Sequence, residues 1–112
     1  IQKEKVNKYF EFDGDASYMS FSPKVRKEYV DKLPGIVHAD GTARVQTVSK
    51  EQNYFLYELL EWFEVLTGYP ILLNTSFNIK GRPILTTVDD AVRSWQETEL
   101  DYLLIEDCLY GK

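Results

Sequence analysis

Apolar positions along the chain occur in short runs that predict alternating strands and helices. The clearest run is Pro-Ile-Leu-Leu at residues 70–73, which follows a Gly-Tyr turn and predicts a short buried strand. Strands are also expected at residues 18–22, 83–85 and 100–105, with an added edge strand at residues 108–110. Together with the helices described next, this order predicts an α/β layer fold with a mixed sheet.

Helical spacing of apolar residues predicts one principal helix. It is expected to begin at Ser49, because Gln52 three residues later completes a capping box, and to end at Gly68. Five apolar residues fall at helical spacing and predict a stripe that packs into the core: Phe55, Leu59, Trp62, Phe63 and Leu66.

Shorter helices are expected before and after the principal one. Residues 24–33 are charged and predict a surface helix or loop, and Thr87 caps a later helix that runs to about Thr98. Residues 2–12 predict a helix whose apolar side consists of Val6, Tyr9 and Phe10.

Residues 35–48 predict a β-hairpin with Asp40-Gly41 at its turn. In the second arm Thr42, Arg44 and Gln46 share one face of the strand. The other face carries Ala43, Val45 and Thr47. This polar face has two interpretations. A solvent-exposed strand would show the same pattern, and spacing alone favours it. A strand that lines an anion pocket would show it too, with the Arg44 guanidinium binding phosphate.

A polar cluster, Asn-Thr-Ser-Phe-Asn at residues 74–78, follows the apolar run directly, and Gly81 and Pro83 then turn the backbone. In open α/β sheets ligands bind beyond the carboxyl ends of strands, so the cluster is a candidate site. The alternative is an Asx or Ser turn whose side chains satisfy only their own backbone. Composition alone slightly favours that alternative.

The charge and composition of the 112 residues narrow the function classes. The net charge of −5, from 13 basic and 18 acidic residues, argues against a nucleic-acid or anionic-membrane surface. The single Cys108 forms no internal disulfide, and no Cys/His grouping has metal-ligand spacing. No run reaches the roughly 20 apolar residues of a membrane span, and no signal peptide is recognised, so a cytoplasmic location is expected. The first residue is not Met, which suggests a piece of a longer protein.

Three motifs together resemble a known family. They are Val-His-Ala-Asp-Gly-Thr-Ala-Arg-Val-Gln-Thr-Val at residues 37–48, Leu-Asn-Thr-Ser-Phe-Asn at residues 73–78 and Gly-Arg-Pro-Ile at residues 81–84. In this order they resemble the carboxyl-terminal domain of carbamoyltransferases, the group that contains nodulation protein U and the cephalosporin and tobramycin carbamoyltransferases. The resemblance extends over nearly all of the chain, including the final Leu-Asp-Tyr-Leu-Leu-Ile.

The resemblance implies an α+β, YrdC-like fold: a twisted mixed sheet with flanking helices, here truncated at its amino-terminal side. Residues 1–112 would be part of a single carbamoyltransferase C-terminal domain, a fragment of a longer enzyme. That domain would take carbamoyl phosphate and ATP, with Mg²⁺, and form carbamoyl adenylate. A separate amino-terminal domain, which binds iron or another metal, would transfer the carbamoyl group to a hydroxyl of a small molecule. The fragment alone is expected to be inactive.

The resemblance also implies which residues bind the substrates. YrdC-like domains bind anions with a Lys-x-Arg pair and a Ser-x-Asn pair. Ser76 and Asn78 match the second pair. Nothing before Lys3 matches the first pair. Arg44 and Thr42 from the hairpin complete the group that is expected to contact phosphate.

Three further residues have less defined roles. Asn74 is expected beside the substrate, and His38 is a candidate for either a ligand contact or a structural hydrogen bond. Relatives usually carry Gly-Glu-Pro-Ile where this chain has Arg82, which reverses the local charge. No catalytic side chain or protein metal ligand is expected, because adenylation depends on positioning and charge stabilisation.

Two alternatives to the carbamoyltransferase hypothesis stay open. One is a YrdC-like module that binds nucleotide or RNA, against which the acidic charge counts. The other is a structural domain that packs on its enzyme partner through an aromatic surface.

Overall fold

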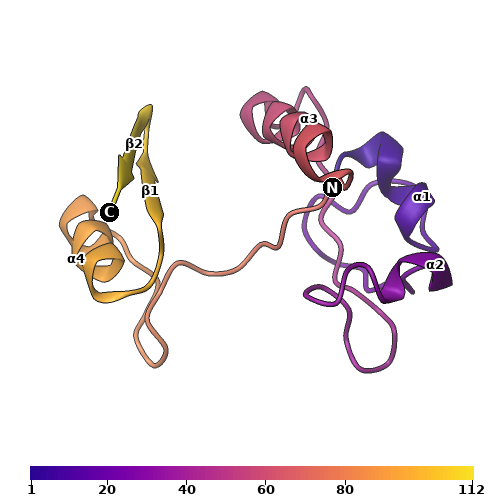
Figure 1. Ribbon diagram of the computed structural model, residues 1–112, viewed down its shortest axis with the longest axis horizontal. Coiled ribbons are helices and arrows are strands. Elements are labelled where there is room, and N and C mark those ends of the chain that lie inside the picture. The colour runs from indigo at the N-terminus through magenta and orange to yellow at the C-terminus, as the bar shows by residue number, and fades with distance from the viewer. The chain divides into compact units, whose positions relative to one another are not determined.

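A computed structural model describes all residues of the chain, 1–112 (Figure 1). It divides into two compact units, Ile1–Leu73 and Asn74–Lys112, which are described separately. The chain contains helices and a small antiparallel sheet, so the expected α+β class is confirmed. No helix has the length and apolar character that crossing a bilayer requires.

The N-terminal unit begins with a 3-10 turn, η1 (Lys3–Lys5), followed by α1 (Val6–Tyr9). The predicted apolar side of this helix is confirmed, because Val6, Tyr9 and Phe10 are all buried. The helix is shorter than expected, since Phe10 is already extended. A second short helix, α2 (Lys27–Val30), lies inside the charged segment that predicted a surface helix or loop.

Extended segments of the N-terminal unit are joined by isolated bridges, not by ladders. Phe21 bridges Val45 and Lys24 bridges Thr42, both in the antiparallel sense. The predicted strand at residues 18–22 is wrong: the backbone of Met19 is left-handed at φ 57°. A strand needs extended φ and ψ at successive residues, and the left-handed residue interrupts them.

The predicted hairpin is correct in its turn but not in its pairing. Gly41 has a φ of 81°, which glycine adopts without steric cost, and its N–H donates to the His38 carbonyl at 2.9 Å. The second arm bonds mainly to residues 16–23 instead of forming a ladder with the first arm. Its alternation is confirmed, because Ala43, Val45 and Thr47 are buried.

Helix α3 (Tyr54–Thr67) is the longest element, and it begins later than predicted. Its N-cap is Asn53, whose Oδ1 accepts a hydrogen bond from the Leu56 N–H at 3.0 Å. Ser49 instead closes the preceding turn, where its hydroxyl oxygen accepts from the Gln52 N–H at 3.3 Å. The predicted end at Gly68 is confirmed by its left-handed φ of 85°.

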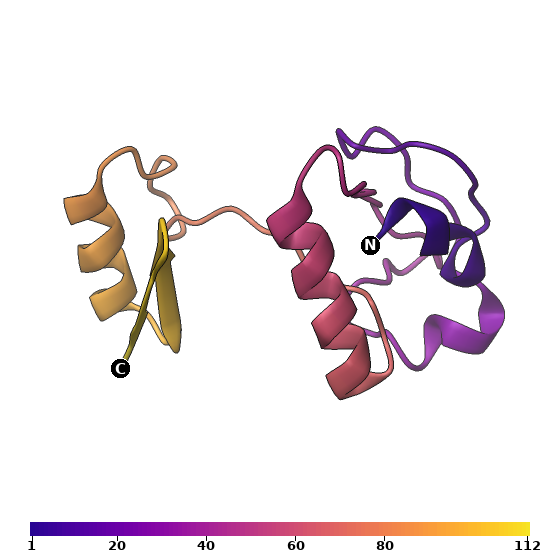
Figure 2. The ribbon, with the colours of Figure 1, turned by 90° about the horizontal axis from the view of Figure 1, so that it is seen from above.

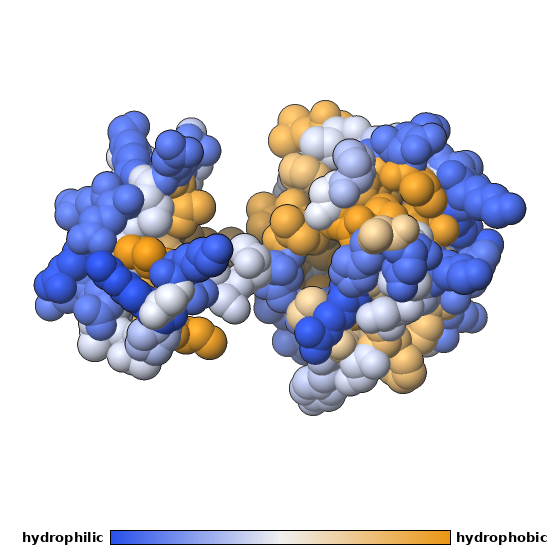
Figure 3. Space-filling model, turned by 90° about the horizontal axis from the view of Figure 1, so that it is seen from below, coloured by the Kyte–Doolittle hydropathy of each residue, from blue (hydrophilic) through white to orange (hydrophobic).

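The face by which α3 packs differs from the prediction. Tyr57 and Leu60 are buried against Val48, whereas Phe55 and Trp62 of the predicted stripe are each 63% exposed. Apolar residues occur on more than one side of this helix, so periodicity alone selected the wrong side. Figure 3 shows apolar areas, in orange, on the face of the N-terminal unit that is seen from below.

Polar contacts hold α3 beside the start of the chain (Figure 2). The Lys5 ammonium pairs with the Glu64 carboxylate, and the Tyr57 hydroxyl donates to Glu4. The bond from Tyr57 and burial of its ring raise the pKa of that phenol to about 12. The packed side of α3 is therefore fixed by both apolar and polar contacts.

The predicted buried strand at residues 70–73 is wrong. No strand forms there, although Pro70 is fully buried and Tyr69 packs against the rings of Tyr9 and Tyr29. Leu73 at the end of the run is 68% exposed. A strand needs a hydrogen-bonded neighbour, and no segment forms a ladder with these residues.

The C-terminal unit contains α4 (Val88–Glu97), β1 (Tyr102–Ile105) and β2 (Cys108–Gly111). The Thr87 hydroxyl accepts from the Asp90 N–H at 3.1 Å, so the predicted cap is confirmed. Strands β1 and β2 pair antiparallel, which confirms the last two predicted strands. The strand expected at residues 83–85 is absent, and this two-stranded pair stands in place of the expected larger mixed sheet.

Candidate functional site

The turn at residues 38–42 is held by one carboxylate. The Asp40 Oδ1 accepts from the Thr42 hydroxyl at 2.7 Å and from the Thr42 N–H at 3.0 Å. The His38 Nδ1 lies 3.3 Å from the same hydroxyl, and the His38 N–H donates to the Thr42 carbonyl. The Thr42 hydroxyl proton is thus engaged by Asp40, which leaves its oxygen as an acceptor. His38 therefore contacts Thr42 within the turn, and a ligand contact by His38 remains a prediction.

The bonds from the Thr42 hydroxyl and N–H hold the pKa of Asp40 below the ordinary 3.8. The stabilisation from this interaction is therefore present above the ordinary pKa and is lost as pH falls through the lowered value. In Thr42→Val we expect the pKa of Asp40 to rise towards 3.8, because only the N–H bond remains. A ¹³C NMR titration of the carboxyl groups measures this shift.

Asp15 supplies an internal control for that titration. Its carboxylate accepts from the Ser17 hydroxyl and N–H in the same arrangement, and these bonds also lower its pKa. Thr42→Val should leave the pKa of Asp15 unchanged. Equal movement of both carboxyls, or an unmoved Asp40, would contradict the local cause.

Arg44 extends from the polar face of the same arm and is exposed. Its Nε donates to the Met19 carbonyl at 2.9 Å, which orients the guanidinium. The terminal nitrogens of the guanidinium carry the N–H pairs that bind phosphate or carboxylate in a bidentate manner. Arg44 is therefore an exposed, oriented cation on the polar face of the arm, and its binding to phosphate remains a prediction.

The loop at residues 74–82 belongs to the C-terminal unit. The Asn78 Nδ2 donates to the Arg82 carbonyl at 3.0 Å, and the Asn78 N–H donates to the Ser76 carbonyl at 3.2 Å. Gly81 has a φ of 84°, which allows the backbone to turn. The Asn78 side chain thus stabilises its own loop, as the turn interpretation expected.

The remaining predicted residues of this loop are accessible. Asn74 and Ser76 are exposed, and Ser76 and Asn78 line a cavity of about 350 Å³ beside Ser94 and Thr98. Arg82 extends to Glu97, with its Nη1 3.4 Å from the carboxylate. This exposed ion pair partly neutralises the charge that Arg82 brings to the loop.

The predicted site residues are distributed over both units. His38, Thr42 and Arg44 lie in Ile1–Leu73, and the Ser76–Asn78 pair lies in Asn74–Lys112. The hydrogen bonds described for each group join residues of the same unit. Their convergence on a shared anion remains a prediction.

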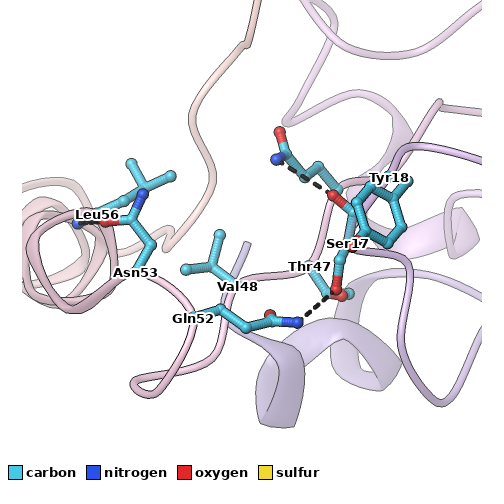
Figure 4. Close-up of a pocket in the computed structure, with 8 residues that line it drawn as sticks. Ser17, Tyr18, Thr47, Val48, Gln52, Asn53 and Leu56 are labelled. Atoms are coloured by element: carbon cyan, nitrogen blue, oxygen red, sulfur yellow. Dashed lines mark hydrogen bonds between the residues drawn. The ribbon is translucent and has the colours of Figure 1, made fainter.

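A second cavity, of about 240 Å³, lies in the N-terminal unit and was not predicted (Figure 4). Its lining is polar but uncharged, with two apolar residues: Ser17, Tyr18, Gln46, Thr47, Val48, Gln52, Asn53 and Leu56. The polar alternation of the second hairpin arm was a signal for Gln46. Nothing in the sequence indicated that residues 17–18 and the start of α3 would meet it.

No group of three or more His, Cys, Asp or Glu side chains is arranged to hold a metal ion.

Comparison with protein families identifies the chain. The family described as Carbamoyltransferase C-terminus matches residues 1–112. The chain belongs to this carbamoyltransferase family. Its motifs and its full-length match agree with the resemblance inferred from the sequence.

Similar proteins include the nodulation protein NolNO of Sinorhizobium fredii, 39% identical over 115 residues, which cover 100% of this chain and 17% of that protein. Nodulation protein U of the same species is 45% identical over 95 residues, 85% of this chain and 16% of that protein. An uncharacterized Synechocystis protein is 40% identical over 132 residues, 100% of this chain and 22% of its own length. The chain thus spans about a fifth of the length of these relatives.

Proposed function

We propose that this chain is the substrate-activating part of an ATP-dependent O-carbamoyltransferase. It binds carbamoyl phosphate and ATP and forms carbamoyl adenylate, and the rest of a longer protein transfers the carbamoyl group to a hydroxyl of a small molecule. The observation that carries the proposal is the match of the carbamoyltransferase family to all 112 residues. The share of the relatives that the chain covers supports a separate transfer domain.

The proposed reaction has two steps. Hydrolysis of carbamoyl phosphate gives carbamate and inorganic phosphate. A carbamate oxygen then attacks the α-phosphorus of ATP, the new O–P bond replaces the bond to the β-phosphate, and pyrophosphate leaves. Both steps concentrate negative charge, so positioned cations and hydrogen-bond donors are the groups that this chemistry requires.

The candidate residues supply such groups. Arg44 offers an oriented guanidinium, and Ser76 offers an exposed hydroxyl in the cavity of its unit. Asn78, Asn74 and Thr42 would add polar contacts from the two loops. Mg²⁺ would be held chiefly by the phosphates of ATP, as is common for this ion. We propose a YrdC-like arrangement in the complete domain and a cytoplasmic location.

His38 and Arg82 would have supporting roles. His38 would fix the turn beside Arg44 through its contact with the Thr42 hydroxyl. Arg82 would reach phosphate only if its ion pair with Glu97 opened.

A structural role is the second candidate, and a specific observation favours it. The exposed face of α3 carries four large apolar side chains that are each at least 45% exposed: Phe55, Leu59, Trp62 and Leu66. In this alternative the chain contributes an interface to the remainder of the carbamoyltransferase and binds no substrate.

Pyrophosphate exchange tests the adenylation proposal. With carbamoyl phosphate present, the full-length carbamoyltransferase should incorporate labelled pyrophosphate into ATP, because adenylation is reversible. The 112-residue chain alone should show no appreciable exchange, because it spans only about a fifth of the length of its relatives. Appreciable exchange by the chain alone would contradict this expectation. Absence of exchange in the full-length enzyme would remove the adenylation proposal.

A further inference from the structure

The uncharged cavity of the N-terminal unit has a composition suited to a flat, neutral, hydrogen-bonding ligand. Gln46, Gln52 and Asn53 line it, the Asn53 carboxamide also capping α3, and Val48 and Leu56 give it an apolar wall. No lysine, arginine, aspartate or glutamate lines it. Its volume of about 240 Å³ is below the roughly 300–1,000 Å³ of sites for whole drug-sized ligands, so it has room for part of a nucleotide.

Polar side chains at the cavity are already oriented (Figure 4). The Gln52 Nε2 donates to the Ser17 hydroxyl at 2.9 Å, and the Gln46 Nε2 lies 3.4 Å from the Ser17 carbonyl. The Ser17 hydroxyl in turn donates to the Asp15 carboxylate. A carboxamide held in this way presents a donor and an acceptor together, which is the pairing that asparagine and glutamine use to bind adenine.

Tyr18 adds an aromatic ring at the edge of the cavity. Its side chain is 90% exposed, although it is large and partly apolar. The loop beneath it is fixed, because the Ala16 N–H donates to the buried Thr47 hydroxyl at 2.8 Å and the Thr47 N–H donates to the Ala16 carbonyl. An exposed ring on a fixed loop is available for stacking on a base.

The charges around the cavity indicate at which end a bound nucleotide would place its phosphates. The Asp15 carboxylate lies on the Ser17 side, where it would repel phosphate. Arg44 stands two residues from Gln46 on the same face of the arm, and it bonds to the backbone of Met19, next to Tyr18. Phosphates would therefore lie towards Arg44 and the base towards Gln52.

We infer that this cavity, formed by Ser17, Tyr18, Gln46, Gln52 and Asn53, binds the base of the nucleotide whose phosphates Arg44 contacts. The inference rests on the proposed function for the presence of ATP. It adds a base subsite whose lining residues all belong to the N-terminal unit.

Binding measurements on the full-length carbamoyltransferase test the inference, with ATP and inorganic tripolyphosphate as the two probes. Tyr18→Ala should weaken ATP binding by about five- to 150-fold, the range of one base–aromatic stack, and should leave tripolyphosphate binding unchanged. Tyr18→Phe keeps the ring and should bind ATP like the wild type. Gln52→Ala should weaken ATP selectively, whereas Gln96→Ala, an exposed position on α4, is the matched control.

The outcomes separate the base subsite from the proposed function. ATP binding that is unchanged in both Tyr18→Ala and Gln52→Ala, while the wild type binds ATP, would overturn the base subsite alone. An equal loss for ATP and tripolyphosphate would overturn it too, because a base contact does not affect a ligand without a base. A wild type that binds neither probe would overturn the proposed function and this inference together. Because Tyr18 and Gln52 are exposed, their replacement should leave the melting temperature of the enzyme unchanged.

Discussion

Replacing Arg44 by alanine in the full-length carbamoyltransferase is expected to weaken ATP and carbamoyl phosphate binding by about 1.5–3 kcal/mol, the scale of a hydrogen bond to a charged group. This corresponds to about a ten- to 150-fold rise in the dissociation constant. The reason is that the guanidinium is oriented by its bond to the Met19 carbonyl and brings a positive charge to the hairpin arm. Isothermal titration calorimetry with each ligand measures the effect.

Arg26→Ala is the matched control for this substitution. The Arg26 Nε also donates to a backbone carbonyl, that of Asn7 at 2.6 Å, but Arg26 belongs to the start of α2. It should retain the wild-type dissociation constants. Unchanged affinity in Arg44→Ala would remove Arg44 from the site. An equal loss in both variants would indicate a general effect of charge or folding.

Leu60→Ala is expected to destabilise the chain by about 2–5 kcal/mol, the usual cost of truncating a fully buried leucine. Leu60 is 1% exposed and packs with Val48 and Tyr57, so its removal leaves a cavity between α3 and the segment beside it. Urea unfolding followed by circular dichroism measures the free energy of unfolding.

Leu66→Ala tests the opposite face of the same helix. Leu66 is 82% exposed, so its truncation should change the stability of the 112-residue chain by less than about 0.5 kcal/mol. If the structural role of the exposed face is correct, the same substitution will be costly in the full-length protein. A large loss from Leu66→Ala in the chain, with a small one from Leu60→Ala, would show that the predicted stripe is the packed face.

The sequence correctly predicted those features that depend only on residues close to one another in the chain. The cap at Thr87 and the stop at Gly68 involve hydrogen bonds or backbone angles within a few residues, and both are confirmed. The pair β1 and β2 is joined by a two-residue turn, so its pairing is also local. The turn at Asp40-Gly41 belongs to the same class.

Features that depend on distant partners were not predictable in the same way. The apolar run at residues 70–73 has strand composition, but composition does not supply the neighbouring strand that a ladder requires. Helix α3 has apolar residues on two sides, and the side that packs was decided by Val48 and by the contacts from Glu4 and Lys5. Sequence periodicity does not contain this information.

In the candidate site, too, local features were predictable from the sequence and features that depend on distant segments were not. The polar face that holds Arg44 and the self-bonded loop of Asn78 follow from local patterns, and the structure shows both. The cavity around Gln52 required three segments to meet, and only Gln46 was indicated beforehand. The engagement of Thr42 by Asp40 is local, and the short Asp-Gly-Thr sequence would have allowed its prediction.

The backbone bonds of residues 42–48 have a consequence for synthesis on the ribosome. The Lys3 N–H donates to the Val48 carbonyl, and the Val48 N–H donates to the Ile1 carbonyl. Ile1 and Lys3 therefore lack their hydrogen-bonding partners until about 45 more residues have been translated. Those residues must also leave the exit tunnel of the ribosome before the bonds can form. The buried cluster that contains Val6, Tyr9 and Phe10 also contains Ala43 and Val45, so it is completed only after residue 45 has left the exit tunnel.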